Sequence, residues 1–367
     1  MAVTVISPSR YVQGRGAMND VGMYAAKLGS KALCLISAGG IGRVGERIKK
    51  SFAQSEASVV FEKFNGECSR TEIDRLVKLV KEQGFDVMIG VGGGKIFDTA
   101  KAAAYYAGIP VAICPTVAST DAPCSALSVI YTDEGAFAEY LFLPANPNLV
   151  LMDTEVIAQS PLRLTVSGMG DAMATYFEAR ACVNSGAGNF AGGTVGVTSF
   201  GIAKLCYDTL VSDGLKAKIA LESQALTPAV ERIIEANTLL SGLGFESCGI
   251  AAAHAIHNGL TQLPECHHMQ HGEKVNFGTL TQLVMENIPE EELAEMLDWM
   301  IAVGLPVTFA ELGVTDTSRE HLMPVADAAC APTDTLHNMP FKVDAEMVYN
   351  AMIAADAYGR RALNAER

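Results

Sequence analysis

Short apolar runs alternate with amphipathic segments along the first third of the chain. The segment from Ser69 to Gln83 is the clearest helix, because its apolar residues, beginning with Ile73 and ending with Val80, recur at the spacing of one helical face. Ser69 and Glu72 have the spacing of a capping box at its start. Runs typical of strands lie at Ala32–Ser37, Ser58–Phe64, Asp86–Val91 and Pro110–Pro115. This alternation predicts an α/β domain in which helices cover a Rossmann-like parallel sheet.

The pattern changes near Ala158. Ser160 followed by Pro161 is typical of a helix start, and beyond it we find no segment with the pattern of a strand. The sequence therefore predicts two domains, an α/β domain over residues 1–158 and an all-α domain over residues 159–367. The helices predicted in the second domain are Asp171–Cys182, Gly192–Val211, Ala217–Glu222, Pro228–Gly242, Gly249–Asn258, Glu273–Glu286, Glu290–Val303 and Ala345–Ala365.

Composition narrows the class of protein. The chain has 367 residues, 49% of them apolar, and a net charge of −14, which argues against a nucleic-acid partner because such binders carry basic patches. It has no apolar run of about 18 residues and no signal-peptide pattern, so we expect no membrane partner and a cytoplasmic location. Its 9 cysteines include no Cys-x-x-Cys pair, which indicates small core residues rather than a disulfide framework.

Histidines are concentrated in one stretch. Five of the 7 histidines lie between His254 and His271. Imidazole is a common metal ligand and a proton carrier near neutral pH. His254 lies on a predicted helix and His271 begins the next, so two imidazoles can converge on one point. An isolated histidine usually caps a helix or fills a polar gap, but this density favours a metal site. Spacing alone does not tell which of the five bind.

Two glycine clusters are candidates for a phosphate site. The first, residues 40–45, fits Gly-x-Gly-x-x-Gly after a strand, although it also fits a flexible turn. The second is Gly92-Gly93-Gly94-Lys95, where small residues let a pyrophosphate approach the start of a helix. These local features slightly favour the second cluster as the phosphate site. Ile96 stands where a Walker motif needs Ser or Thr, so hydrolysis of ATP or GTP is not supported.

A hydroxyl-rich segment follows the strand that ends at Pro115. It contains Thr116, Ser119 and Asp121. Ligands of open α/β sheets bind at such strand ends, although a polar turn with Asp121 as a cap residue has the same composition.

Together these motifs resemble the iron-containing (group III) alcohol dehydrogenase family, and within it the branch that oxidises glycerol. The resemblance covers nearly the whole chain. The motifs that carry it are Gly-Gly-Gly-Lys-x-x-Asp at 92–98, Pro-Thr-x-Ala-Ser-Thr-Asp-Ala-Pro at 115–123, Ser-Ala-Leu-Ser-Val-Ile-Tyr at 125–131, Gly-Asp-Ala at 170–172, Gly-Phe-Glu-Ser at 244–247, Ala-His-Ala-x-His-Asn-Gly at 253–259 and His-Gly-Glu-Lys-Val at 271–275.

The resemblance implies NAD-dependent oxidation of glycerol, or of a related small diol, with glycerol converted to dihydroxyacetone. By it, zinc (Zn2+) is held by Asp171, His254 and His271, with His254 also counted as catalytic, and Asp121 contacts the substrate. It further implies a homo-oligomer, typically an octamer. The residues that it assigns to the dinucleotide are Ser37, Gly92, Gly93, Gly94, Lys95, Asp98, Thr116, Ser119, Ser125, Leu127 and Tyr131.

One position departs clearly from the family pattern, and another separates this chain from the iron-binding branch. Iron-binding members carry His four residues after the Asp ligand, whereas this chain has Thr175, which favours a three-ligand zinc site with an open position. Ser37 stands where glycerol-oxidising members generally have Asp against the adenosine ribose. An uncharged residue there weakens the preference for NAD over NADP.

The expected chemistry is Lewis-acid activation of the alcohol by zinc, followed by hydride transfer to the nicotinamide, with Asp121 helping to orient the substrate. Two alternatives stay open. A glycerol-1-phosphate dehydrogenase or a sugar-phosphate cyclase would need basic residues near the metal, but Lys274 is the one Lys or Arg close to the histidines in sequence. A non-catalytic metal- or nucleotide-binding protein is the other class, and the nearly complete set of expected site residues argues against it.

Overall fold

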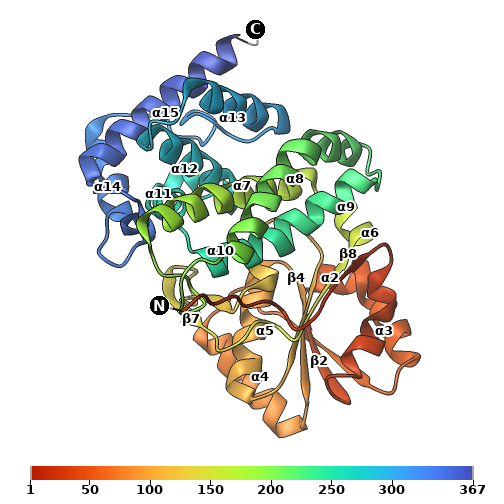
Figure 1. Cartoon of the computed structure of the whole chain (residues 1–367). Coiled ribbons are helices and arrows are strands. Elements are labelled where there is room, and N and C mark those ends of the chain that lie inside the picture. Colours follow the sequence, from red (N-terminus) through yellow and green to blue (C-terminus); the bar gives the residue numbers. More distant parts are fainter. Residues whose placement is uncertain (1, 366–367) are drawn as a thin grey trace. The chain divides into compact units, whose positions relative to one another are not determined.

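The computed structural model describes residues 2–365, which form two compact units (Figure 1). The first unit runs from Ile6 to Ser160. The second joins the chain from Pro161 onward with the few residues that precede Ile6. Those first residues hydrogen-bond there, because the Thr194 amide donates to the Ala2 carbonyl oxygen at 2.9 Å.

A six-stranded parallel sheet forms the centre of the first unit as described. Its strands, in spatial order, are β1 (Tyr11–Gly14), β8 (Leu149–Asp153), β5 (Val111–Pro115), β4 (Val87–Gly92), β2 (Lys31–Ile36) and β3 (Ser58–Lys63). The inner strands are buried on both faces, which explains their nearly continuous apolar sequences. Ala32, Cys34 and Ile36 of β2 pack into the core on one face, and the residues between them point to the other.

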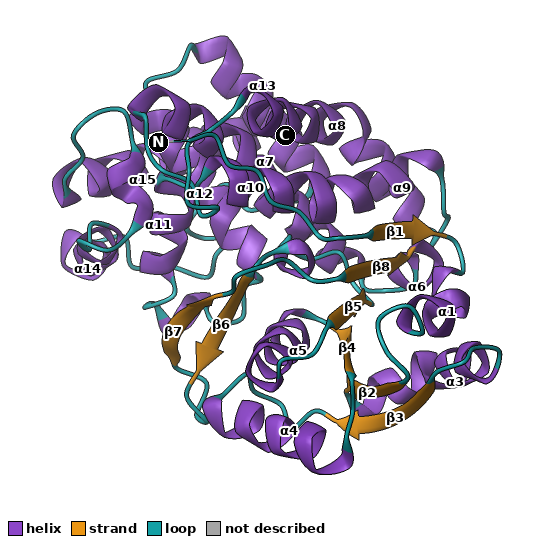
Figure 2. Ribbon diagram, turned by 60° about the horizontal axis from the view of Figure 1, so that its bottom comes forward, coloured by secondary structure: helices purple, strands orange, loops and turns teal. Residues whose placement is uncertain are grey.

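Helices cover both faces of this sheet, as Figure 2 shows. One layer contains α1 (Val21–Ala25) and α3 (Glu46–Ala53), and the other contains α4 (Arg70–Gln83) and α5 (Gly94–Ala107). The helix α4 begins as predicted, because the Ser69 hydroxyl accepts a hydrogen bond from the Glu72 amide at 3.3 Å. The Glu72 carboxylate binds Asn65 and Arg75 rather than completing the capping box.

Several strands have no counterpart in the sequence pattern. They are β1, β8 and an antiparallel hairpin of β6 (Leu127–Tyr131) and β7 (Phe137–Phe142). In the described chain β1 lies at the sheet edge and its one neighbour is β8. The buried Asp153 carboxylate strengthens this pairing, because it accepts hydrogen bonds from the Gly16 and Met18 amides, both at 3.0 Å.

The first glycine motif is helical. Its residues lie in α2 (Ala38–Gly40) and the π-helical segment η2 (Ile41–Gly45), and the backbone φ angles are −64° at Gly40 and −58° at Gly45. Ser37 caps this helix, because its Oγ accepts a hydrogen bond from the Gly40 amide at 3.1 Å. Glycines inside helical turns do not form an open phosphate-binding loop, so the structure gives this motif a different role from the Rossmann glycines.

The second unit is mostly helical, which together with the parallel sheet confirms the predicted fold class. Figure 1 shows its helices stacked around α7 and α12. Their bounds are α7 Leu162–Ser185, α8 Val197–Glu222, α9 Pro228–Glu235, η4 Ala236–Leu240, α10 Ser241–Cys248, α11 Ala252–Leu260, α12 His271–Met285, α13 Glu290–Val303, α14 Arg319–Ala329 and α15 Ala345–Ala365.

The predicted break between Gly192–Val211 and Ala217–Glu222 is wrong, because α8 runs through it. Gly214 lies inside this helix, and a Cβ atom there would be 3.1 Å from Nε1 of Trp299. The glycine therefore serves close packing against an indole ring, and it does not end the helix.

All nine cysteines lie within the described residues and are free thiols, and eight of them are buried. No single helix among those residues is both long and apolar enough to cross a membrane, although the bent pair Pro228–Cys248 and Ala252–Leu260 meets the same criteria of length and composition.

Candidate active site

Three helices of the second unit touch through their backbones at glycines. A Cβ atom on Gly272 of α12 would lie 1.8 Å from the Ser167 carbonyl oxygen of α7, and one on Gly170 of α7 would lie 2.5 Å from the Gly272 oxygen. A Cβ atom on Gly278 of α12 would lie 2.3 Å from the Ala253 oxygen of α11. Only glycine permits such approaches, so the sequence fixes how closely α7, α11 and α12 cross.

These crossings bring together the three predicted metal ligands. Asp171 on α7, His254 on α11 and His271 on α12 each offer an atom within 4.8 Å of the others. Asp171 Oδ1 lies 3.1 Å from His271 Nε2 and 3.4 Å from His254 Nε2. Among residues 2–365 they form the one such group of His, Cys, Asp and Glu, and one carboxylate with two imidazoles is a ligand set that suits zinc and also iron.

The electrostatics of the group favour a bound cation. Burial by itself raises the pKa of Asp171, but the two imidazoles outweigh burial and hold the pKa of that carboxyl well below its usual range. Burial lowers the pKa of His254, whereas the charges of Glu178 and Asp171 raise it well above the usual value. The acidic partners therefore stabilise positive charge at this point, and a divalent metal ion would supply it in place of protons.

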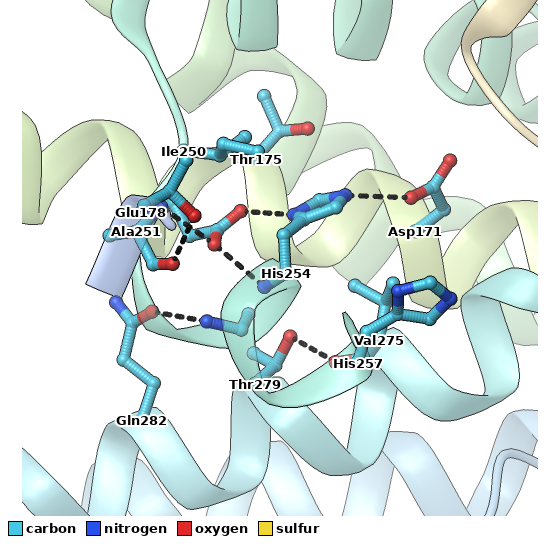
Figure 3. Close-up of polar contacts among 12 residues, drawn as sticks. Asp171, Thr175, Glu178, Ile250, Ala251, His254, His257, Val275, Thr279 and Gln282 are labelled. Atoms are coloured by element: carbon cyan, nitrogen blue, oxygen red, sulfur yellow. Dashed lines mark hydrogen bonds and ion pairs between the residues drawn. The ribbon is translucent and has the colours of Figure 1, made fainter. Parts of the chain in front are cut away.

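Glu178 holds His254 from the side opposite Asp171, as the close-up in Figure 3 shows. Its Oε2 lies 2.6 Å from His254 Nδ1. Its Oε1 accepts hydrogen bonds from the amides of Ala251 at 2.8 Å and His254 at 3.0 Å. The sequence analysis missed Glu178, although a residue seven positions after Asp171 on a helix lies on nearly the same face.

The remaining histidines of the cluster lie around the three ligands. The His257 Nε2 atom lies 3.0 Å from His271 Nδ1, and burial lowers the pKa of His257 well below its usual value. His267 is exposed and its Nε2 contacts the Thr261 carbonyl oxygen at 3.0 Å. His268 packs beside Gly313. None of these three belongs to the group of converging ligand atoms in the described chain.

Thr175 lies one helical turn after Asp171. Its hydroxyl is buried and forms a hydrogen bond with the Ser241 hydroxyl at 2.9 Å. Its methyl group lies against Gly244, where an added Cβ atom would be 2.5 Å away. The side chain at this position is thus held against α10.

In the first unit, the predicted dinucleotide residues gather at the carboxyl ends of adjacent parallel strands. Ser37 follows β2, Gly92 ends β4 and Thr116 follows β5, and these strands are neighbours in the order β5, β4, β2. The carboxyl edge of an open α/β sheet is where such folds bind ligands. Ser119 and Asp121 lie half-buried in the segment that follows β5, and the Asp121 side chain does not cap the short helix η3 (Ala122–Cys124).

The glycine segment joins β4 directly to the start of α5. Gly92 has a φ of +156°, and a Cβ atom there would lie 2.5 Å from Ile96 Cδ1. Thr116 fixes this turn, because its amide and hydroxyl donate to the Gly92 carbonyl oxygen at 3.0 and 3.2 Å. Gly93 and Gly94 then begin the helix, whose N-terminus is a suitable site for a pyrophosphate. Lys95 is half-exposed and pairs with Glu67 at 2.6 Å.

A buried ion pair connects α5 with the hairpin. Lys101 Nζ lies 3.0 Å from Asp98 Oδ1, and it donates to the Ser125 hydroxyl at 3.2 Å and to the Leu127 carbonyl oxygen. Asp98 Oδ2 also accepts a hydrogen bond from the Val129 amide. Burial raises the pKa of Tyr131 at the end of β6. The structure thus turns Asp98 toward Lys101 and the hairpin, and the sequence analysis did not identify Lys101.

Comparisons with known proteins agree with this geometry. A family model described as iron-containing alcohol dehydrogenase matches residues 8–154. The chain is 51% identical to a glycerol dehydrogenase of Escherichia coli O6:H1 over 97% of both chains, and 45% identical to a glycolaldehyde reductase of Halobacterium salinarum over 97% of both. The crystal structure of glycerol dehydrogenase from Schizosaccharomyces pombe superposes with a TM-score of 0.96 at 40% identity, covering 100% of this chain and 93% of that one.

Proposed function

Because the chain belongs to the iron-containing alcohol dehydrogenase family, we propose that it oxidises glycerol to dihydroxyacetone with NAD as the hydride acceptor. The chain is an alcohol oxidoreductase, and the proposal concerns its substrate, cofactor and metal. The observation that carries it is the convergence of Asp171, His254 and His271 in a chain half identical to a glycerol dehydrogenase along nearly its full length. Related small diols are further candidate substrates.

Each set of residues has a distinct part in this proposal. Asp171, His254 and His271 would hold a divalent metal ion, which when bound supplies Lewis acidity that lowers the pKa of an alcohol. The amides at the start of α5 would bind the NAD pyrophosphate, since a helix N-terminus favours negative charge. Asp121 is our candidate for a substrate contact that orients the hydroxyl groups and relays a proton.

We propose zinc as the metal. The side chain of Thr175 binds Ser241, so that the ligand set consists of one carboxylate and two imidazoles. Three protein ligands with an open position are typical of catalytic zinc sites. Iron(II) accepts similar ligands, and metal analysis of the purified protein distinguishes the two.

The rival functions have less support. A phosphate-bearing substrate requires unpaired basic groups beside the metal, whereas Lys274 is buried and Arg163, which also lies near the histidines, is paired with Glu273 at 2.5 Å. A homo-oligomer and a cytoplasmic location stay predictions.

The experiment is an NADH absorbance assay on adding glycerol, with and without a chelator, beside metal analysis. We expect glycerol- and metal-dependent reduction of NAD. Asp171→Asn, His254→Ala and His271→Ala should each lose the metal and the activity while still binding NADH, since the dinucleotide residues lie in the other unit. A variant that keeps full metal occupancy and a near-normal rate would show that its residue is not a ligand.

A further inference from the structure

We propose that Glu178 is a positioning residue that fixes the tautomer of His254, so that the Nε2 lone pair of this imidazole faces the metal ion. The inference rests on the metal site of the proposed function and adds a residue whose role is to select one of the two neutral forms of a ligand. It comes from the hydrogen bonds around His254, which place a hydrogen on Nδ1 and leave Nε2 as the nitrogen that faces the ligand group.

The Glu178 carboxylate determines which imidazole nitrogen of His254 carries hydrogen. Glu178 is fully buried on α7, and its Oε2 lies 2.6 Å from His254 Nδ1. A carboxylate accepts hydrogen bonds and cannot donate them, so Nδ1 must carry the hydrogen. A neutral imidazole protonated at Nδ1 has its lone pair at Nε2. That atom is the one that faces Asp171 Oδ1, at 3.4 Å.

The other carboxylate oxygen of Glu178, Oε1, also has fixed hydrogen-bond partners. Oε1 accepts hydrogen bonds from the amides of Ala251 and His254, at the start of α11. Backbone N–H groups can only donate, so Oε1 is held as their acceptor and Oε2 stays beside the His254 ring. One side chain therefore holds both the backbone of His254 and its ring, and the ring cannot rotate without breaking a short hydrogen bond.

His271 has a neutral partner in place of a carboxylate. Its Nδ1 lies 3.0 Å from His257 Nε2, and His257 Nδ1 lies 3.1 Å from Asn258 Oδ1, an amide oxygen that can only accept. Asn258 is held in this orientation because its Nδ2 donates to Asp334. The hydrogen of His271 is therefore set through a chain of neutral groups, whereas a single buried carboxylate sets that of His254.

Glu178→Gln is the variant that separates this role from packing. Glutamine has the same shape, and its amide oxygen can keep both backbone hydrogen bonds at the start of α11. Its NH2 group then faces His254 Nδ1, which must become the acceptor. The ring hydrogen moves to Nε2, and an Nε2–H group cannot bind a metal ion. The substitution should thus preserve the helix and reverse the tautomer.

Two further variants complete the design. Glu178→Asp keeps the negative charge but is one methylene too short to make both sets of contacts, so it tests whether charge alone suffices and also replaces Glu178→Gln if that variant does not fold. Asp356→Asn is the matched control, because Asp356 is a buried carboxylate of the same unit that accepts from the Phe309 amide at 2.9 Å and pairs with Arg360 at 3.0 Å.

The measurement is the affinity of each protein for Zn2+ and Co2+ by competition with a chelator, together with the visible d–d bands of the Co2+-loaded form. We expect Glu178→Gln and Glu178→Asp to bind about 10–100-fold more weakly, the usual effect of losing a hydrogen bond to a ligand, with altered Co2+ bands. Asp356→Asn should match the unsubstituted protein.

Near-native affinity in either Glu178 variant, or an equal loss in Asp356→Asn, would overturn the inference. Failure of the unsubstituted protein to bind either ion would instead refute the metal site of the proposed function, and the inference with it.

Discussion

Gly272→Ala tests whether the metal ligands are positioned by the contact of helix backbones. The added Cβ atom would lie 1.8 Å from the Ser167 carbonyl oxygen, whereas ordinary contact begins near 3.4 Å. The atom that it meets belongs to the backbone of α7 and cannot rotate away. The helix α12 must therefore move from α7 by about 1.6 Å, the difference between these distances, or rotate by an equivalent amount.

That displacement is large on the scale of a metal site. His271 precedes Gly272 directly, and the same Cβ atom would lie 2.9 Å from the Asp171 amide nitrogen. Metal–ligand distances are held within about 0.2 Å, so a shift of this size removes His271 from the ligand set. We expect metal affinity to fall at least 100-fold, and the free energy of unfolding to fall by about 1–3 kcal/mol, as in other overpacked contacts.

The assay combines chelator competition for Zn2+ with urea unfolding of the metal-free protein. Gly201→Ala is the matched control, because Gly201 lies on an exposed face of α8 and an added Cβ atom there meets nothing within 4 Å. It should keep its metal and gain up to about 1 kcal/mol from the higher helix propensity of alanine. Native metal affinity in Gly272→Ala, with a change in unfolding free energy below about 0.5 kcal/mol, would refute the reasoning.

Three further predictions concern other parts of the site. Ser37→Asp should retain the helix cap, since Asp is also a good N-cap. It should lower kcat/KM for NADP relative to NAD by about tenfold or more, because a carboxylate repels the 2′-phosphate of NADP. An unchanged ratio of the two kcat/KM values would show that this side chain does not face the ribose. His267→Ala and His268→Ala should each reduce activity much less than His271→Ala, and equal losses in a steady-state assay would change the ligand assignment. Lys101→Met leaves a buried carboxylate unpaired and should cost about 3–5 kcal/mol in urea unfolding, whereas a cost under about 1 kcal/mol would show that the pair is dispensable.

The sequence predicts the fold class because the spacing of apolar residues typical of helices and the apolar runs typical of strands are both local patterns. The pairing of β1 with β8 could not be predicted, since it joins segments at opposite ends of the unit through backbone hydrogen bonds that leave no side-chain pattern. The break expected in α8 has a similar origin. Gly214 lies between the two predicted segments, and the reason for a glycine there is the indole ring of Trp299, which is distant in sequence.

The candidate site likewise combines features that the sequence predicts with features that depend on the packing of distant segments. The density of histidines predicts a metal centre, but the choice among them depends on how α7, α11 and α12 cross. The glycines that fix these crossings are Gly170, Gly272 and Gly278. Their packing role could not be read from the sequence, because it depends on the backbone that lies opposite each of them. Glu178 was missed for a related reason, since its partner is 76 residues away in sequence.

The place of β1 at the sheet edge has a consequence for synthesis on the ribosome. Met18, just after β1, meets its partner Asp153 only 135 residues later in the chain. At about 5–20 residues per second, that separation corresponds to roughly 7–27 s of translation. The sheet can begin only from β2, β3, β4 and β5, and β5 then presents an open edge until β8 emerges. Unpaired edges associate with other chains, so the rate of translation between β5 and β8 determines how long the nascent protein is exposed to aggregation.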